Sequence, residues 1–163
     1  MIEEPKIIDF PKTRLIGAHV STSFINDRTS ETWRGFRPIM QTIPGRIGNE
    51  SFSVKIYDAS YSFSSFDPTV EFEKWAAVAV SDNAAVPDGL EPLTLPAGTY
   101  AEFTHVGLAT TAPRIFGYIF GQWLPASPYE LDLRPHLEIL PPGYDPFDEN
   151  ATERVFIPTR PKS

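Results

Sequence analysis

The chain has 163 residues, of which 41% are hydrophobic and 13% are aromatic, and it contains 17 prolines. This size fits a single domain spanning residues 1–163, and so many prolines exclude a protein built from long helices. The formal net charge is −7 and the basic residues are scattered, which excludes direct nucleic-acid binding through a basic surface. Without cysteines, the chain has neither disulfides nor cysteine-based metal sites.

The N-terminal sequence MIEEPKIIDF lacks the apolar core of a signal peptide, and no stretch approaches the roughly 18 apolar residues of a membrane span. We therefore expect a soluble cytoplasmic protein. The three histidines show no metal-ligand spacing with one another or with nearby acids, so neither a metal nor another cofactor is expected.

The first half of the chain predicts the order strand, helix, strand, strand. Residues 12–20 are apolar and predict the first strand, and Thr29 or Ser30 is expected to cap the helix. Pro38 is expected to kink or shorten this helix. Its apolar stripe recurs at spacings of three and four residues and consists of Trp33, Phe36, Met40 and Ile43.

Two strands complete this half. Residues 51–58 alternate between apolar and polar side chains, which is typical of a half-buried strand. Residues 71–80 predict a second strand, in which Trp75 shares a face with Ala77 and Ala79. The alanines of this segment also fit a helix, but its valines and the turn that follows favour a strand.

The second half repeats this order. Residues 93–106 predict a strand pair or a bent strand broken at Pro96 and Gly98, and the last two strands are predicted at residues 137–140 and 153–159. Antiparallel strands crossed by two helices predict an α+β fold, with a natural place for a cleft between its halves.

The helix of the second half is expected to start at a Thr110 or Thr111 cap, with Pro113 in its first turn, and to end at Pro125. Its apolar stripe consists of Ile115, Phe116, Ile119, Phe120 and Trp123. The order strand-helix-strand-strand therefore occurs twice, in pseudo-repeat halves of about residues 12–82 and 93–160.

Glu138 is a lone acid inside the apolar stretch PHLEIL. Strand alternation places His136 and Leu140 on its face. From the residues alone two interpretations stay open: an acid at a strand edge that points to water, or an acid in a pocket that meets a cationic or polar part of a ligand.

Aromatic rings around such an acid would attract a ligand by stacking and cation–π interactions, although each ring can equally be ordinary core. We favour Trp75, because the small alanines on its face leave room beside it. The candidates are Trp33, Tyr57, Trp75, Tyr118, Tyr144 and Phe156.

Four stretches taken together resemble the GyrI-like effector-binding family, from about Lys12 to Arg160: EFEKWAAVAV, PLTLPAGTYAEFTHVG, IFGYIFGQWLPASPYELDLRPHLEIL and RVFIPTR. The resemblance implies a tandem β-α-β-β repeat (SHS2 modules), whose curved antiparallel sheet and two helices surround a central ligand cleft. Such domains also occur fused to AraC-type and MerR-type DNA-binding modules in bacterial regulators. No such module precedes residue 12, so we do not expect a transcription factor that contacts DNA itself.

The resemblance also implies small ligands, often aromatic and cationic, and gives Glu138 the role of the pocket acid. The residues expected to bind the ligand are Glu138, Trp75, Trp33, Tyr57, Tyr118 and Phe156. We favour a binding module without catalysis. Two alternatives stay open: a hydrolase that uses Glu138 on strained or electrophilic small molecules, and a protein whose partner is gyrase or a separate regulator.

Overall fold

The computed structural model describes residues 4–61, 63 and 67–163. In the described part of the chain, no helix is long and apolar enough to cross a membrane. The elements are β1 (Lys6–Phe10), β2 (Thr13–Thr22), α1 (Thr29–Met40), β3 (Ser51–Ile56), β4 (Phe72–Ala79), β5 (Glu91–Leu95), β6 (Gly98–Val106), the 3₁₀ turn η1 (Ala109–Thr111), α2 (Ala112–Tyr118), the π-helical turn η2 (Ile119–Trp123), α3 (Leu124–Ala126), β7 (Tyr129–Leu131), β8 (His136–Leu140) and β9 (Thr152–Pro161).

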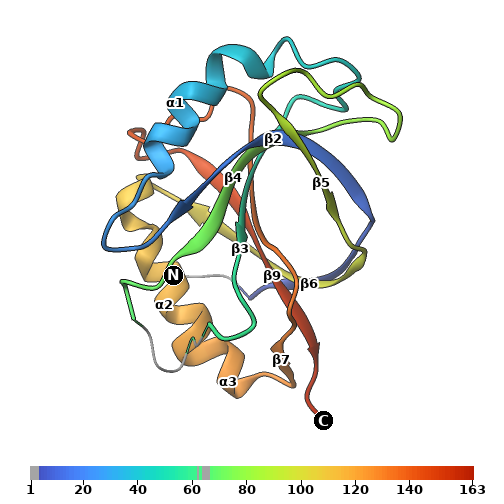
Figure 1. Ribbon diagram of the computed structural model, residues 1–163. Coiled ribbons are helices and arrows are strands. Elements are labelled where there is room, and N and C mark those ends of the chain that lie inside the picture. Colours follow the sequence, from blue (N-terminus) through green and yellow to red (C-terminus); the bar gives the residue numbers. More distant parts are fainter. Residues whose placement is uncertain (1–3, 62, 64–66) are drawn as a thin grey trace.

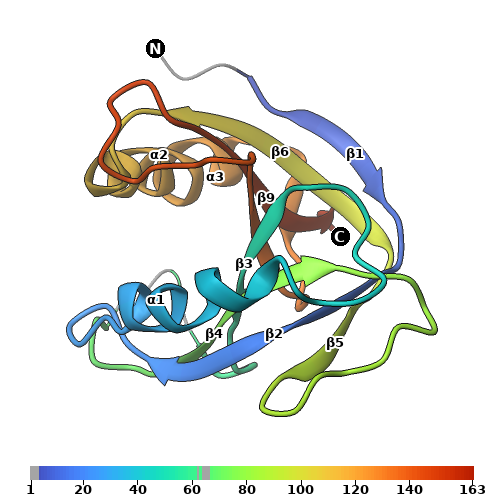
Figure 2. The ribbon, with the colours of Figure 1, turned by 90° about the horizontal axis from the view of Figure 1, so that it is seen from above.

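The strands form one antiparallel sheet of nine strands in the order β1-β6-β9-β8-β3-β4-β2-β5, and β7 pairs with β9 (Figure 1). The sheet is strongly curved, and α1 and the α2–α3 helix lie on the same side of it (Figure 2). The predicted α+β fold with a curved antiparallel sheet and two helices is confirmed. The strands β9, β8 and β3 lie in the middle of the strand order.

One face of the sheet, the core face, carries a cluster of large apolar side chains. It includes Phe10, Leu15, Val54, Trp75, Tyr100, Leu137 and Phe156. The register accounts for this membership, because Trp75 is the cross-strand partner of Val54 and Leu137 is the partner of both Val54 and Phe156. Such cross-strand partners point to the same face.

The opposite face, the helix face, carries the two helices over different strands. Trp33 and Phe36 of α1 pack on Ala76 and other apolar residues of β2 and β4. Ile115 and Ile119 of the second helix pack on apolar residues of β6 and β9. Between these two clusters, β3 and β8 present the helix face with mostly polar residues, namely Ser51, Ser53, Lys55, His136 and Glu138.

The predicted helix caps are wrong. In α1 neither Thr29 nor Ser30 is the cap: Arg28 holds the N-cap position without a side-chain cap bond, and an Asp27 carboxylate oxygen accepts the Thr29 N–H at 2.9 Å. The helix runs through Pro38 and ends at Met40, so Ile43 lies beyond it. Thr111 precedes α2 but its side chain does not cap that helix. Its hydroxyl bonds instead to the Leu108 carbonyl oxygen and to His105.

The sequence patterns located most of the strands. Residues 71–80 form a strand rather than a helix, as the valines favoured. Residues 93–106 contain two strands that pair with different partners, since β5 adds to β2 and β6 lies between β1 and β9. The short strands β1 and β7 were not predicted.

Candidate functional site

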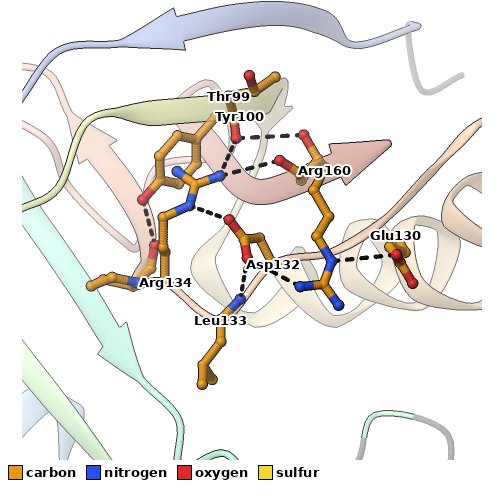
Figure 3. Close-up of polar contacts among 9 residues, drawn as sticks. Thr99, Tyr100, Glu130, Asp132, Leu133, Arg134 and Arg160 are labelled. Carbon is orange, nitrogen blue, oxygen red and sulfur yellow. Dashed lines mark hydrogen bonds and ion pairs between the residues drawn. The ribbon is translucent and has the colours of Figure 1, made fainter. Parts of the chain in front are cut away.

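The entry into β8 is fixed by Arg134, which lies just before it (Figure 3). Its Nε donates to Asp132 Oδ2 at 2.7 Å, and its Nη2 donates to the Thr99 carbonyl oxygen at 2.6 Å. The guanidinium also lies over the Tyr100 ring, 4.7 Å from the centroid. The Tyr100 hydroxyl donates to the Pro135 carbonyl oxygen at 2.8 Å. These contacts hold the chain directly ahead of His136 and Glu138.

Glu138 is paired with a lysine of the neighbouring strand. Its carboxylate lies 3.2 Å from the Lys55 ammonium, and both side chains are largely buried. The Lys55 ammonium also lies over the Phe116 ring of α2, 4.2 Å from the centroid. A buried carboxylate needs a positive partner, and here the chain itself supplies one.

A second acid, Glu153 of β9, reaches the same place from the other side. Its carboxyl group is buried and lies 2.9 Å from His105 Nδ1. His105 Nε2 lies 2.9 Å from the Thr111 hydroxyl, which donates its proton to the Leu108 carbonyl oxygen. His105 Nε2 must therefore carry a proton and donate it to Thr111. Nδ1 of the neutral ring is then an acceptor, so the bond with Glu153 needs a protonated Glu153.

The two carboxyl groups differ in protonation. Burial and the negative charge of Glu138 raise the pKa of Glu153 to about 9. Burial would also raise the pKa of Glu138, but the Lys55 and Lys74 charges lower it to about 2. Near neutral pH one carboxyl group of the pair is therefore protonated and the other is ionised.

A ring-lined cavity of about 520 Å³ adjoins this charged cluster. Its lining, the aromatic pocket, combines five rings with three charged side chains: Tyr57, Tyr61, Phe63, Phe120 and His136, and Asp58, Asp132 and Arg134. Phe63 stacks on Phe120 and on His136, with ring centroids 4.7 and 5.4 Å apart, respectively. Burial and the Lys55 charge lower the pKa of His136 to about 3, so its ring is neutral. Because His136 is the cross-strand partner of Lys55, the aromatic pocket ends beside the buried charges.

A family model for the GyrI-like small molecule binding domain matches residues 3–160. This chain belongs to that family. The match confirms the resemblance seen in the sequence, and it runs from before β1 to residue 160 of β9.

Relatives of this GyrI-like domain include a transcriptional regulator. BrlR of Pseudomonas aeruginosa is 27% identical over 158 residues, which are 94% of this chain. The chain spans about half of BrlR, 54% of its length.

Solved structures share the fold at low sequence identity. SAV2435, solved bound to tetraphenylphosphonium, is 14% identical with a TM-score of 0.69, over 97% of this chain and 94% of its own. The C-terminal domain of EcmrR is 15% identical with a TM-score of 0.72, over 99% of both chains. A hydrolase from Listeria innocua is 12% identical with a TM-score of 0.58, over 96% of this chain and 92% of its own.

The structure of this GyrI-like domain brings together only some of the predicted site residues. Glu138 shares the helix face with His136, and Tyr57 lines the aromatic pocket. Trp33 and Tyr144 pack in the apolar cluster under α1. Tyr118 lines a different cavity of about 560 Å³, formed with Glu4, Pro5, Ile7 and the end of the second helix.

Trp75 and Phe156 do not lie beside Glu138. Both belong to the core face, so the sheet itself separates them from the Glu138 carboxylate. The favoured position of Trp75 is therefore wrong: its neighbours are His19, which stacks on it with ring centroids 4.5 Å apart, and Glu73, which accepts its indole N–H. Ala77 on its face is fully buried in that core, and Ala79 packs against it.

Sequence reasoning missed Lys55, Lys74 and Glu153. The two lysines alternate with apolar residues in their strands, the pattern of side chains that face water. Glu153 stands at the start of a strand, where an acid is usually solvated. The sequence does show a charged residue in each of the strands β3, β4 and β9. Only the order of the strands in the sheet, which the sequence does not reveal, brings these residues together.

Proposed function

We propose that this GyrI-like domain binds small amphipathic aromatic molecules in the aromatic pocket, without catalysing a reaction on them. The observation that carries the proposal is a cavity of about 520 Å³ that is lined by rings and ends beside the buried Lys55–Glu138 pair. Rings give stacking partners to the flat part of a ligand, and the charges give a partner to its polar end. The fold likeness to SAV2435, solved bound to tetraphenylphosphonium, supports this ligand class.

Glu138 is the candidate partner for a ligand that carries a positive charge. Lys55 already occupies this position, so a cation binds only after the Lys55 ammonium has moved away. Because the cation would then be the sole partner of a desolvated carboxylate, Glu138→Gln should weaken tetraphenylphosphonium binding roughly tenfold or more. Neutral triphenylmethanol should bind both proteins within about twofold of each other.

The test of ligand binding is a calorimetric titration with these two compounds. Saturable binding of at least one compound is expected, with a loss of roughly tenfold or more in Tyr57→Ala. Tyr118→Ala is the matched control, because Tyr118 lines the other cavity. The proposal fails if neither compound binds, or if the two tyrosine variants lose affinity equally.

A second candidate function is hydrolysis, which the Glu138–Glu153 pair favours. Two adjacent carboxyl groups, one ionised and one protonated near neutral pH, have the form of a general base and a general acid. In that reaction the Glu138 carboxylate accepts a proton from the attacking water, and Glu153 donates one to the leaving group. The fold likeness to a hydrolase from Listeria innocua is consistent with it.

Turnover distinguishes the two candidates. A cyclopropane-containing test compound should be consumed only if the domain is an enzyme, and both Glu138→Gln and Glu153→Gln should then abolish its consumption. Binding of the compound without consumption supports the binding module and excludes hydrolysis of that compound.

A further inference from the structure

The edge cavity is a second cavity, of about 560 Å³, which the proposed function leaves without a role. Its lining includes Ile7 of the edge strand β1, Tyr118 and Trp123 of the second helix, and Tyr129 of β7. The aromatic pocket uses Phe120 from the same helix, and none of the described residues belongs to both linings. The second helix therefore presents a different set of side chains to each cavity.

Ile7 gives the edge cavity an apolar surface that the fold leaves partly uncovered. Its cross-strand partner is Ala101, which belongs to the apolar cluster under the second helix, so Ile7 lies on the helix face. Because β1 is the outermost strand and lies beyond β6, the helix does not cover it fully, and 41% of Ile7 is exposed (Figure 2). An apolar side chain that is open to a cavity is available to a ligand.

Three aromatic rings line the edge cavity and favour a positively charged ligand. The rings of Trp123 and Tyr129 lie nearly parallel, with an interplanar angle of 17° and centroids 6.4 Å apart. Phe103 of β6 packs edge-on against the Trp123 ring, with centroids 5.2 Å apart, and restrains its orientation. Tyr118 supplies the third ring. The face of each ring attracts a cation that lies within about 6 Å of its centroid.

Local structure holds these rings in place. Trp123 is the last residue of the π-helical turn Ile119–Trp123, a rare form of helix that often occurs at functional sites. The Ser127 hydroxyl donates to the Leu124 carbonyl oxygen at 2.8 Å and accepts the Tyr129 N–H at 3.1 Å, which fixes the turn between the helix and β7. A ligand thus meets rings whose positions are already set, and this lowers the entropic cost of binding.

The edge cavity carries a negative charge. Among the described residues that line it, Glu4 alone is charged, and this residue is exposed. The Lys162 ammonium donates to the Pro125 carbonyl oxygen at 2.8 Å and is not part of the lining. A lining of rings and one carboxylate attracts a cation and repels an anion.

We propose that the edge cavity binds a small, fully alkylated ammonium ion, with its methyl groups on the rings and its charge balanced by Glu4. Such an ion combines a positive charge with an apolar surface and so matches both the rings and Ile7. Glu4 would repel a phosphate group, so the ligand is a free ion rather than a lipid headgroup. The site is separate from the aromatic pocket and does not depend on the proposed function.

Choline and 3,3-dimethylbutanol test the role of the charge, because they have the same shape and only choline is charged. An NMR titration near neutral pH follows the indole N–H signal of Trp123, identified by its loss in Trp123→Phe. Choline should bind saturably and roughly tenfold or more tightly than the alcohol. Equal affinities, or no saturable shift of this signal with choline, overturn the proposal. Phosphocholine should bind more weakly than choline, and equal or tighter binding overturns the assignment to a free ion.

The variant Glu4→Gln removes the charge from an exposed residue and should leave the fold intact. Choline affinity should fall roughly threefold or more, while the affinity for the alcohol stays within about twofold. The matched control is Glu130→Gln, because Glu130 of β7 pairs with Arg160 and does not line the cavity, and it should change neither affinity. A choline affinity that Glu4→Gln lowers no more than Glu130→Gln does overturns the proposal.

The variant Tyr129→Leu keeps an apolar side chain and removes its ring, so choline affinity should fall roughly threefold or more. Unchanged affinity in the folded variant overturns the proposal. Tetraphenylphosphonium separates the two cavities: its phenyl groups cover its charge, so an excess of it should leave the choline-induced shift of Trp123 unchanged. Displacement of choline would place choline in the aromatic pocket and overturn the proposal. Loss of tetraphenylphosphonium binding alone would overturn the proposed function and leave this site standing.

Discussion

The Lys55 ammonium lies 3.2 Å from the Glu138 carboxylate, so the acid that the sequence presents as a ligand partner already has a partner within the chain. Lys55 extends from β3 across one strand spacing to β8, and Phe116 of α2 covers it from the other side. The pair thus joins the sheet to the second helix. It also fixes the charge that a ligand meets.

Replacing Glu138 by glutamine should destabilise the fold, because it leaves the Lys55 ammonium buried without a counter-charge. We expect a loss of about 3 kcal/mol in the free energy of unfolding, measured by urea denaturation at neutral pH. The double variant Lys55→Met/Glu138→Leu removes both charges and should lie within about 1 kcal/mol of the parent protein, or above it. A double variant as unstable as the single one would show that the charge pair does not cause the effect.

Glu153 should make the fold less stable as the pH rises. Its pKa is raised from 4.5 to about 9 on folding, so its contribution to stability is complete below about pH 4.5 and is lost progressively towards pH 9. The slope is at most about 1.4 kcal/mol per pH unit. Glu138 has the opposite shift and affects stability only below about pH 4.5.

The variant Glu153→Gln imitates the protonated acid and should remove this slope. Its stability relative to the parent protein should therefore increase steadily between about pH 5 and pH 8, a window that ends where Lys74 begins to titrate. Urea denaturation at several pH values measures the difference. Parallel pH profiles for the two proteins would mean that Glu153 is ionised in the folded state.

Arg134 should matter more than its distance from the charged cluster suggests, because its guanidinium holds the start of β8. Arg134→Met removes hydrogen bonds to Asp132 and to the Thr99 and Thr159 carbonyl oxygens and should cost about 2–3 kcal/mol. Arg160→Met is the matched control. Arg160 also pairs with Asp132, but its side chain is 57% exposed, so a loss below about 1 kcal/mol is expected. Equal losses in urea denaturation would contradict this role.

The sequence predicted the fold better than the site, for a physical reason. Hydrophobic periodicity is a local property, and the 3.6-residue and 2-residue repeats located both helices and most strands. Alternation also placed His136 and Leu140 correctly on the face of Glu138. The strands β1 and β7 were missed because five and three residues are too few to establish a period.

Which residues share a face across different strands depends on pairing between distant segments. Trp75 lies in β4 and Glu138 in β8, and these two strands do not pair directly. No local sequence pattern therefore tells whether their side chains point to the same face of the sheet. Lys55 and Lys74 resembled the solvent side of half-buried strands, and only the two helices and the segment containing Tyr57 make them interior. The burial of these charges therefore depends on the tertiary structure. The sequence alone shows which charged residues are present, but not that they are buried together.

The contact between β2 and β4 depends on the absence of a side chain at Gly17. A Cβ atom built there would lie 2.1 Å from the Ala76 carbonyl oxygen, which is backbone and cannot turn away. Gly17→Ala should therefore push the two strands apart and cost about 2–3 kcal/mol, a typical penalty for overpacking a core. The clash falls on Ala76 and Ala77 of β4, the strand that also carries Lys74.

Gly35 offers the matched control for the same substitution. It lies within α1, and a Cβ atom there would meet nothing within 4 Å. Gly35→Ala should stabilise the protein by about 1 kcal/mol, because alanine is the better helix former. Thermal and urea denaturation of the two variants should give opposite signs relative to the parent protein. Destabilisation of similar size in both would mean that the close approach at Gly17 does not determine the packing of β2 on β4.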